Sequence, residues 1–527
     1  MNFNSTWLTV ILLFIGSYYL FLFIESFKVK IKNVLPLNSY FYFLIIPAKN
    51  EEKVIEVTVR KCLKLKGTNF RIIVVDDNST DSTSEIVKGI AEKNDKVILL
   101  HNPPNQKKKG KGAVLNFAFN QIKFALSKNF VFPLNLPADF NNRFDYEHII
   151  IGVFDADASP SSNMLEEISK VFSEEMVDAV QTAVRISNRN QSILAKMQDV
   201  EFIGFSRIIQ KARSHFGSVG LGGNGQFTKL SSLIKIGQEP WGDTLTEDLE
   251  LGLRLISQGK RLSFTDRAIV EQEGLISLKA LIKQRSRWLQ GHFMNWMYIP
   301  SIIKAKIPLK TKIDSFIYIV FVSVVFLVGF SITASVLSIL HIISVSNSML
   351  SIFYNKNFLL GTLALLLYSF VFIPMFIYSV FKFYKENSFL KKMLYIFLFA
   401  VYTYIWLPAG IIGLYRLIRK KSEWMKTERV GVVPRSQYKI PSNNFAYERR
   451  AAPRYVYHNF SFINGEPCFV ENVSETGIKI ITIPNKFDKG EIVDINFPNM
   501  VEKKARIVWC RTKERIAEMG FEFVAKN

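Results

Sequence analysis

The chain has 527 residues, carries a formal net charge of +22 and is 49% hydrophobic, with 45 phenylalanines. This composition is too apolar for an ordinary soluble enzyme of this length. The positive charge flanks hydrophobic segments, which favours a membrane protein over a nucleic-acid binder. Cys62, Cys468 and Cys510 form neither a CxxC pair nor a Cys/His cluster, so neither a disulfide framework nor a zinc site is predicted, and a reducing compartment fits.

The first predicted element is a membrane helix within residues 1–34. Trp7–Ile24 carries no charged side chain, and Lys28, Lys30 and Lys32 follow it. Because cations gather on the cytoplasmic side of spans, this end of the helix is expected inside. No small-residue cleavage site is obvious, so an uncleaved span is predicted rather than a signal peptide.

Strands and helices alternate through residues 35–274. Apolar runs at Phe41–Ile46, Phe70–Val75, Lys96–Leu100 and Ile149–Phe154 predict strands, and the stretches between them predict helices. This order predicts an α/β domain with a parallel sheet and helices on both faces. Ligands of such sheets bind beyond the carboxyl ends of the strands.

Acidic residues follow two of these strands. Asp76 and Asp77 come after the second, and Asp155 and Asp157 come after the fourth. In an extended segment, the last two side chains fall on one side and can share a hard cation such as Mg²⁺, which would hold a diphosphate.

A lysine- and glycine-rich stretch, KKKGKG, spans residues 107–112 and leads into a predicted helix. Lysines and exposed N–H groups at a helix start suit a phosphate. The alternative for a lysine run is a solvated loop.

The stretch WGDTLTEDLELGLRL, residues 241–255, places several acids at the start of a predicted amphipathic helix. Thr244 and Glu247 have the spacing of a capping box, and acids in a first turn offset the helix dipole. The acids therefore have a purely structural interpretation, against which a catalytic role for one of them has to be weighed.

The second half of the chain up to residue 420 suits a membrane. Residues 275–312 mix aromatic and basic side chains, which predicts helices lying on the inner membrane surface. Phe316–Leu340, Phe358–Phe381 and Met393–Leu417 are each long enough to cross a bilayer. Cations flank the last of them on both sides, and the stretch from Pro408 to Gly410 could break it, so we expect it to be re-entrant or interfacial.

A charged linker, residues 421–447, precedes a different pattern. Residues 448–527 contain short alternating strands, which predict a small β-barrel. RRAAPR supplies the basic side chains of Arg449, Arg450 and Arg454, and NVSETG supplies Asn472, Ser474 and Gly477. Contact with anionic lipid is the alternative explanation for the arginines.

Six motifs in one order give the central region a family resemblance. They are IIPAKNEE, VVDDNSTDST, GKGAVLN, VFDADASP, TEDLELGLRL and QRSRW, between Phe41 and Trp296. This set resembles processive family 2 glycosyltransferases, such as cellulose and hyaluronan synthases. The resemblance implies a GT-A type cytosolic domain that transfers a sugar, usually from a UDP-sugar, with inversion to an acceptor at the membrane.

The resemblance also implies roles for individual residues. Asp76 or Asp77 would contact uracil and ribose, with Lys111 near the nucleotide. Asp155 and Asp157 would hold Mg²⁺ or Mn²⁺ and the diphosphate. The general base would be Asp248. The QxxRW residues, which would hold the diphosphate and the acceptor sugar, are Gln284, Arg287 and Trp288.

One departure bears on the product. Cellulose synthases usually carry an aromatic-x-Cys-Gly-Thr/Ser stretch beside the acceptor, whereas the corresponding stretch here is GLGGNGQF, residues 220–227, without cysteine. The sequence is also similar to membrane glycosyltransferases that glucosylate diacylglycerol or ceramide. An exopolysaccharide is the leading expectation and a glycolipid the alternative.

The carboxyl-terminal region resembles a PilZ domain through RxxxR, NxSxxG and GFEF. The resemblance implies cyclic di-GMP binding, with Arg450 and Arg454 gripping phosphates and guanine edges. The expected switch has Arg449 or a neighbouring residue tether the QxxRW region until cyclic di-GMP recruits these arginines.

Together these features predict a cyclic di-GMP-activated glycosyltransferase of the inner (plasma) membrane. It is expected to be multi-pass, with both domains cytoplasmic and a glycan or lipid acceptor, and an accessory membrane subunit would complete a channel. A second alternative is a cyclic di-GMP receptor whose transferase domain is inactive. Nucleic acid is not an expected partner.

Overall fold

The structure is a computed structural model. It describes residues 5–28, 39–67, 69–103, 110–127, 134, 136–137, 139–173, 177–320, 374–419, 454–464, 466–474, 477–482, 487–496, 503–513 and 516–524. Several predictions fall outside these residues: most of the two spans at Phe316–Leu340 and Phe358–Phe381, the lysines at 107–109, the linker, Arg449 and Arg450.

The central sheet has eight strands in the order β3-β2-β1-β4-β7-β6-β8-β5. The four predicted strands form its first half: β1 Phe41–Ala48, β2 Phe70–Asp76, β3 Val97–His101 and β4 Ile149–Val153. They pair in parallel, as predicted.

The second half departs from the predicted all-parallel sheet. It contains β5 Ser159–Pro160, β6 Val177–Ile186, β7 Gln226–Lys229 and β8 Arg261–Gln272. Strand β7 runs antiparallel to both β4 and β6. It enters the sheet at the end of β4, because Gly225, at φ +73°, donates its N–H to the carbonyl of Val153 at 2.9 Å. A glycine loop thereby starts a strand at the edge where the parallel strands end.

Strand β1 continues through Pro47, where the sequence analysis ended it. The N–H of Asp77 donates to the carbonyl of Ala48, so the backbone hydrogen-bonding groups of Ala48 point toward β2. Those of Pro47 therefore point toward the β4 side. Pairing with β4 has already stopped at Ile45. The missing N–H of Pro47 therefore interrupts no ladder.

The two faces of β1 belong to two hydrophobic cores. Phe41, Phe43 and Ile45 pack on one face, and Tyr42 and Leu44 pack on the other, all nearly inaccessible to solvent. This alternation follows from the two-residue period of a strand and explains why the sequence of β1 is continuously apolar.

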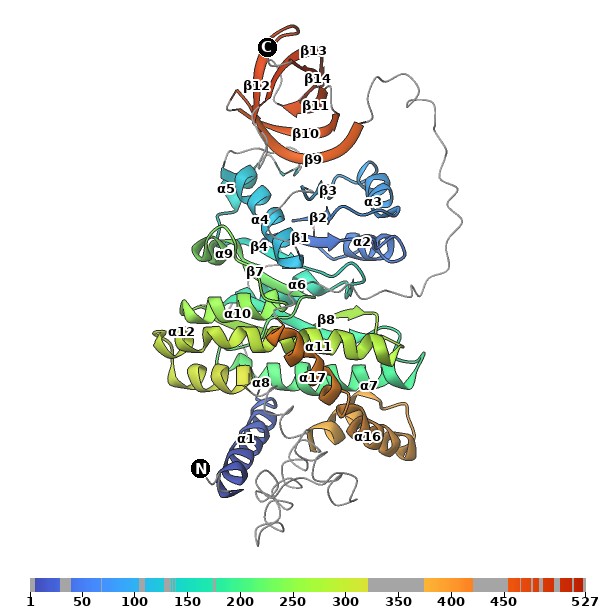
Figure 1. Cartoon of the computed structure of the whole chain (residues 1–527), viewed down its shortest axis with the longest axis vertical. Helices are drawn as coiled ribbons and strands as arrows, with labels where there is room; N and C mark the ends of the chain where they lie inside the picture. The colour runs from blue at the N-terminus through green and yellow to red at the C-terminus, as the bar shows by residue number, and fades with distance from the viewer. Residues whose placement is uncertain are drawn as a thin grey trace.

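Helices cover both faces of the sheet, as predicted (Figure 1). The helices are α2 Ile55–Leu63, α3 Thr83–Ala91, α4 Lys111–Ser127, α5 Phe140–Arg143, α6 Met164–Phe172, α9 Leu230–Ile236 and α10 Glu247–Ser257.

A helical layer lies on one side of this domain, at the bottom of Figure 1. It contains α1 Ser5–Glu25, α7 Ile193–Glu201, the π-helix η2 Phe202–Ile209, α8 Gln210–Ser214, α11 Leu278–Met294, η3 Asn295–Tyr298, α12 Ile299–Lys304, α16 Phe389–Thr403 and α17 Trp406–Ile418. Residues 309–320 are also helical. Helix α1 covers the predicted first span, and α11 to α12 cover the region predicted to lie on the membrane surface.

The last predicted span is helical but breaks earlier than expected. Helices α16 and α17 meet at Tyr404 and Ile405, and Pro408 lies in the first turn of α17. Proline is tolerated there, because N–H groups in a first turn have no intrahelical acceptor. Among the residues that the structure describes, the run Phe389–Ile418, 30 residues long, is the one helix long and apolar enough to cross a membrane.

The carboxyl-terminal strands form the predicted barrel, which is closed, in the order β10-β11-β14-β13-β12-β9. The strands are β9 Arg454–Ile463, β10 Glu466–Ser474, β11 Gly477–Thr482, β12 Ile492–Asn496, β13 Lys503–Lys513 and β14 Ile516–Phe523. Strand β9 lies against β3 and α4, and the buried side chains of Phe469 and Ile481 join the hydrophobic cluster on the α4 face of the sheet. Figure 1 shows the barrel on the opposite side of the eight-stranded sheet from α11 and α17.

Candidate active site

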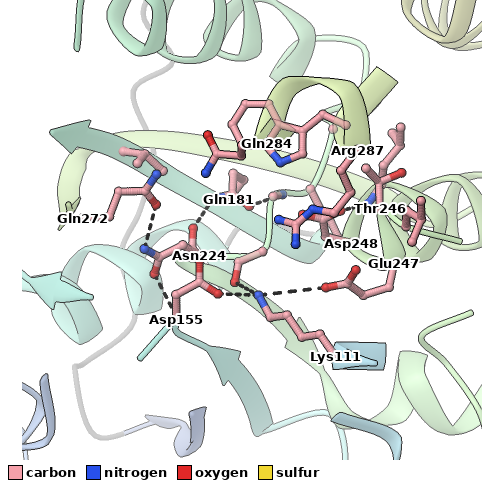
Figure 2. Close-up of a pocket in the computed structure, with 18 of the residues that line it drawn as sticks. Lys111, Asp155, Gln181, Asn224, Thr246, Glu247, Asp248, Gln272, Gln284 and Arg287 are labelled. Carbon is pink, nitrogen blue, oxygen red and sulfur yellow. Dashed lines mark hydrogen bonds and ion pairs between the residues drawn. The ribbon is translucent and has the colours of Figure 1, made fainter. Parts of the chain in front are cut away.

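A pocket of about 350 Å³ opens at the carboxyl edge of the sheet. Its floor is formed by the ends of β1, β2 and β4, and its walls by the start of α10, one side of α11 and Trp406 of α17. Most of the predicted site residues line it: Asp77, Lys111, Asp155, Asp157, Asp248, Gln284, Arg287 and Trp288. Figure 2 shows this pocket with Asp155, Lys111, Glu247, Asp248 and Arg287 around one space.

Asp155 and Asp157 both line the pocket, although they lie in a turn and not in the extended segment that was expected. The N–H of Asp155 donates to Asn224 Oδ1 at 3.3 Å, and Asp157 Oδ2 accepts the N–H of Glu273 at 3.0 Å. Within the described part of the chain, no group of three His, Cys, Asp or Glu residues is placed to hold a metal. Two carboxylates still fit Mg²⁺ or Mn²⁺ bound with a diphosphate, because phosphates and water then complete the coordination.

Lys111, the first residue of α4, bridges the two sides of the pocket. Its Nζ lies 2.5 Å from Asp155 Oδ1, 2.8 Å from the carbonyl oxygen of Gly223 and 3.9 Å from Glu247 Oε1. Burial acts to lower the pKa of Lys111, but the carboxylates of Asp155 and Glu247 outweigh it and hold that pKa above its usual value. The pocket thus contains a permanent positive charge suited to a diphosphate.

Asp248, the second residue of α10, faces this lysine across the pocket (Figure 2). Its Oδ1 accepts the N–H of Leu249 at 2.7 Å. Burial raises the pKa of Asp248, and Lys111 offsets part of that effect. A carboxylate with a raised pKa is a stronger base than an exposed aspartate, as a proton acceptor for a sugar hydroxyl requires.

The capping box predicted around Thr244 and Glu247 is wrong. Helix α10 begins after Thr246, whose hydroxyl caps no helical N–H and instead accepts from Asn295 Nδ2 at 2.9 Å. Glu247 was expected to be structural, yet it lines the pocket beside Asp248. Glu250 is structural as expected, since it accepts the N–H of Thr244 at 3.0 Å.

Glu247 and Asp248 form a coupled acidic pair. Burial, followed by the charge of Asp248, raises the pKa of Glu247 to about 7.

A carboxyl whose pKa is raised on folding stabilises the fold below its unfolded pKa, and this stability is lost as the pH rises through about 7. We therefore expect Glu247→Gln to melt about 2–4 °C above the wild type at pH 8 and at the same temperature at pH 4. Differential scanning fluorimetry at both pH values would measure this, and an equal difference at both would contradict the assignment.

Helix α11 contributes Gln284, Arg287 and Trp288, which lie at spacings of three and four residues and so share one helical face. All three line the pocket. Figure 2 shows Arg287 near Asp248 and Glu247. The indole of Trp288 has the guanidinium of Arg285 over its ring, with the carbon Cζ 4.0 Å from the centroid, so a stacked sugar is limited to the rest of its surface.

The structure gives Asp76 and Asp77 different surroundings, a difference that the sequence alone does not show. Asp77 lines the pocket, and its Oδ1 accepts from Asn102 Nδ2 at 2.7 Å. Asp76 is buried at the end of β2, with its Oδ2 3.4 Å from His101 Nδ1. Asp77 therefore faces the pocket, and Asp76 supports the turn that carries it by accepting the N–H of Ser79.

Polar residues that the sequence analysis missed hold the glycine-rich loop before β7, residues 220–225, against the pocket. Gln181 accepts the N–H of Gly222 at 2.8 Å and donates to the carbonyl of Asn224 at 2.8 Å, and Asn224 Nδ2 donates to Gln272 Oε1 at 3.1 Å. A methyl group on Gly223 would lie 2.6 Å from Lys111 Nζ. These residues come from β6, β8 and the loop before β7, and no local motif connects them.

In the barrel, the backbone brings together part of the second predicted site. Arg454 at the start of β9 pairs with Ser474 at the end of β10, and Asn472 pairs with Val456. Gly477 begins β11, where a methyl group would lie 2.2 Å from the carbonyl oxygen of Phe521. Arg449 and Arg450 lie outside the described residues.

Two family models match the chain. Residues 40–291 match Glycosyltransferase like family 2, and residues 447–527 match the PilZ domain. Residues 40–291 are therefore a family 2 glycosyltransferase domain, and residues 447–527 are a carboxyl-terminal PilZ domain.

The chain is also similar to curated glycosyltransferases. The chain is 30% identical to beta-monoglucosyldiacylglycerol synthase of Nostoc sp., over 56% of the chain and 57% of the relative. It is 27% identical to the probable glycosyltransferase YdaM of Bacillus subtilis, over 73% and 86%, and 28% identical to poly-beta-1,6-N-acetyl-D-glucosamine synthase of Staphylococcus aureus, over 47% and 53%. The chain spans little more than half the length of the first of these relatives.

Proposed function

We propose that the protein is an inverting, membrane-bound β-glycosyltransferase that takes a UDP-sugar and builds an exopolysaccharide under the control of cyclic di-GMP. The observation that carries this proposal is the position of Asp248, opposite Lys111 and beside Arg287 in one pocket. Inverting transfer needs one base for the acceptor hydroxyl and positive charge for the leaving diphosphate. The pocket contains both.

Each end of the donor meets suitable residues. Asp77 would contact the nucleoside, and Lys111 and Arg287 would take up the negative charge that develops on UDP as the glycosidic bond breaks. Asp155 and Asp157 would hold Mg²⁺ or Mn²⁺, which when bound supplies Lewis-acid stabilisation of the same diphosphate. Asp248 would accept the proton of the attacking hydroxyl.

The acceptor has two candidates. A growing glycan is supported by the PilZ domain and by the similarity to poly-beta-1,6-N-acetyl-D-glucosamine synthase. A lipid acceptor is supported by the similarity to beta-monoglucosyldiacylglycerol synthase and by Trp406, which lines the pocket from the helical run Phe389–Ile418. A hydroxyl at the membrane surface could reach Asp248 along that wall.

The proposed location is the inner (plasma) membrane, with several spans and with both domains in the cytoplasm. Its support is the cation-flanked apolar segments of the sequence and the exposed apolar side chains of α16 and α17, including Leu390, Phe397 and Ile418. For a polymer product, an accessory membrane subunit would complete the export channel.

Cyclic di-GMP would act through the barrel. Arg449, Arg450 and Arg454 would bind its phosphates and guanines, with Asn472, Ser474 and Gly477 on the strand side. Strand β9, which starts at Arg454, lies against α4, which starts at Lys111. This contact favours transmission through α4 over a direct tether to α11, which Figure 1 places on the far side of the eight-stranded sheet.

A labelling experiment tests the proposal and separates the acceptors. The full chain in lipid vesicles would receive radiolabelled UDP-glucose or UDP-N-acetylglucosamine with Mg²⁺ or Mn²⁺, with and without cyclic di-GMP. We expect label in a polymer only when the dinucleotide is present. Label in a chloroform-soluble product would identify the glycolipid synthase, and equal label with and without cyclic di-GMP would refute the switch. A protein that binds the dinucleotide but transfers nothing would be the receptor with an inactive transferase domain.

A further inference from the structure

A buried ion pair lies directly behind the pocket. Arg285, on α11, is 1% exposed, and its Nη2 donates to Glu201 Oε2 at 2.5 Å. Tyr402, on α16, donates to the same carboxylate oxygen at 2.6 Å and accepts from Arg285 Nη2 at 3.3 Å. The triad of Arg285, Glu201 and Tyr402 therefore joins α7, α11 and α16.

Arg285 does not line the pocket, but it touches three residues that do. Its Nη1 donates to Gln284 Oε1 at 2.7 Å. Its Cζ lies 4.0 Å from the ring centroid of Trp288 and 5.5 Å from that of Trp406. A planar guanidinium with five fixed donors can satisfy these contacts at the same time, which a lysine ammonium cannot.

We propose that Arg285 is a positioning residue that holds Gln284, Trp288 and Trp406 in the arrangement that receives the acceptor. The inference rests on the proposed function, since it assigns these residues to the acceptor side of the same pocket. Glu201 and Tyr402 fix the guanidinium, and the guanidinium then fixes one face of Trp288 and the amide of Gln284. The part of Trp288 that lines the pocket is left for the acceptor.

The triad also connects the pocket to the apolar run Phe389–Ile418. Tyr402 belongs to that run, and α17 packs closely on α11, where a methyl group on Gly413 would lie 2.8 Å from the carbonyl oxygen of Ser286. Arg416 Nε donates to Gln290 Oε1 at 3.0 Å across the same interface. The acceptor wall is therefore held partly by a helix that can enter a membrane.

The chain supplies a matched control. Arg185 makes two hydrogen bonds of 2.8 Å to Asp199, and Tyr384 donates its hydroxyl to the same carboxylate. In this second triad Asp199 and Tyr384 are buried and Arg185 is half-buried, and none of the three lines the pocket. Tyr384→Phe and Arg185→Lys therefore repeat the chemical change of Tyr402→Phe and Arg285→Lys away from the acceptor.

The experiment compares these four variants of the full chain in lipid vesicles. We expect Tyr402→Phe and Arg285→Lys to raise the KM for the acceptor identified by product fractionation about tenfold, which is the effect of one or two lost hydrogen bonds, with the donor KM little changed. Tyr402→Phe removes one hydroxyl and retains the ion pair, so it tests the inference if Arg285→Lys fails to fold. The two control variants should leave both KM values near those of the wild type.

A second readout does not depend on activity. The ¹⁹F resonance of 5-fluorotryptophan at position 288, assigned with Trp288→Phe, should move in Tyr402→Phe and stay in place in Tyr384→Phe. If the resonance moves but the wild type transfers no sugar, the proposed function fails and the positioning role stands. If the wild type transfers sugar and both tyrosine variants behave alike in KM and resonance, the positioning role is overturned.

Discussion

Replacing Asp248 by asparagine is expected to lower the rate of sugar transfer by about 10²–10⁴-fold, the usual contribution of a general base. Asparagine has nearly the same volume but cannot accept the proton of the attacking hydroxyl. The position of Asp248 opposite Lys111 leaves donor binding intact, so the loss should appear in kcat and hardly in the donor KM. Steady-state release of UDP from the UDP-sugar in the presence of acceptor measures both constants.

Asp243→Asn is the matched control for this prediction. Asp243 belongs to the same stretch of sequence, but its side chain is exposed and lies outside the pocket. The control should transfer sugar at the wild-type rate. An Asp248→Asn variant that retains that rate would show that another group takes the proton, and Glu247 would be the next candidate.

The second large effect is expected from Arg287→Lys. Lysine keeps the positive charge but loses the planar fork that can hold two phosphate oxygens. Because negative charge builds up on UDP as the bond to the sugar breaks, the loss should concentrate in the transition state and lower kcat by about 10²–10³-fold. Rapid-quench measurement of a single turnover would separate this chemical step from product release.

Arg254→Lys provides the comparison for Arg287. Arg254 lies on α10 and donates to the carbonyl oxygens of Glu239 and Pro240 at 2.7 and 2.8 Å, away from the catalytic pocket. Its replacement should leave the single-turnover rate unchanged. Equal rates for Arg287→Lys and the wild type would remove Arg287 from the stabilisation of the leaving group.

The first half of the sheet could be predicted from sequence because each strand is a short apolar run ended by polar residues. The second half could not. The direction of β7 depends on how the loop around Gly225 meets the end of β4, which is a tertiary contact without a local pattern. The turn that contains Asp155 and Asp157 was misread for a similar reason, since alternation of acids predicts a shared side but not the backbone that provides it.

The acidic residues of the site were predictable as a set because they lie at neighbouring sheet ends. The role of each individual residue was harder to predict. Thr244 has the spacing of a capping box with Glu247, yet it lies before the start of α10, and its hydroxyl accepts a hydrogen bond from Asn295 Nδ2 at 3.4 Å. Arg285 was passed over between two motif residues, because its importance comes from Glu201 and Tyr402, which are distant in sequence. Residues that position others are visible only when these partners are brought together.

The configuration of the newly formed bond tests the central claim most directly. The product formed from UDP-α-glucose or UDP-α-N-acetylglucosamine labelled with ¹³C at C1 would be isolated and its anomeric coupling constant measured by NMR. A single displacement assisted by Asp248 predicts a β linkage in the wild type and, over the same reaction time, about 10²–10⁴-fold less labelled product from Asp248→Asn. An α linkage, or equal amounts of β-linked product from both proteins, would contradict this account.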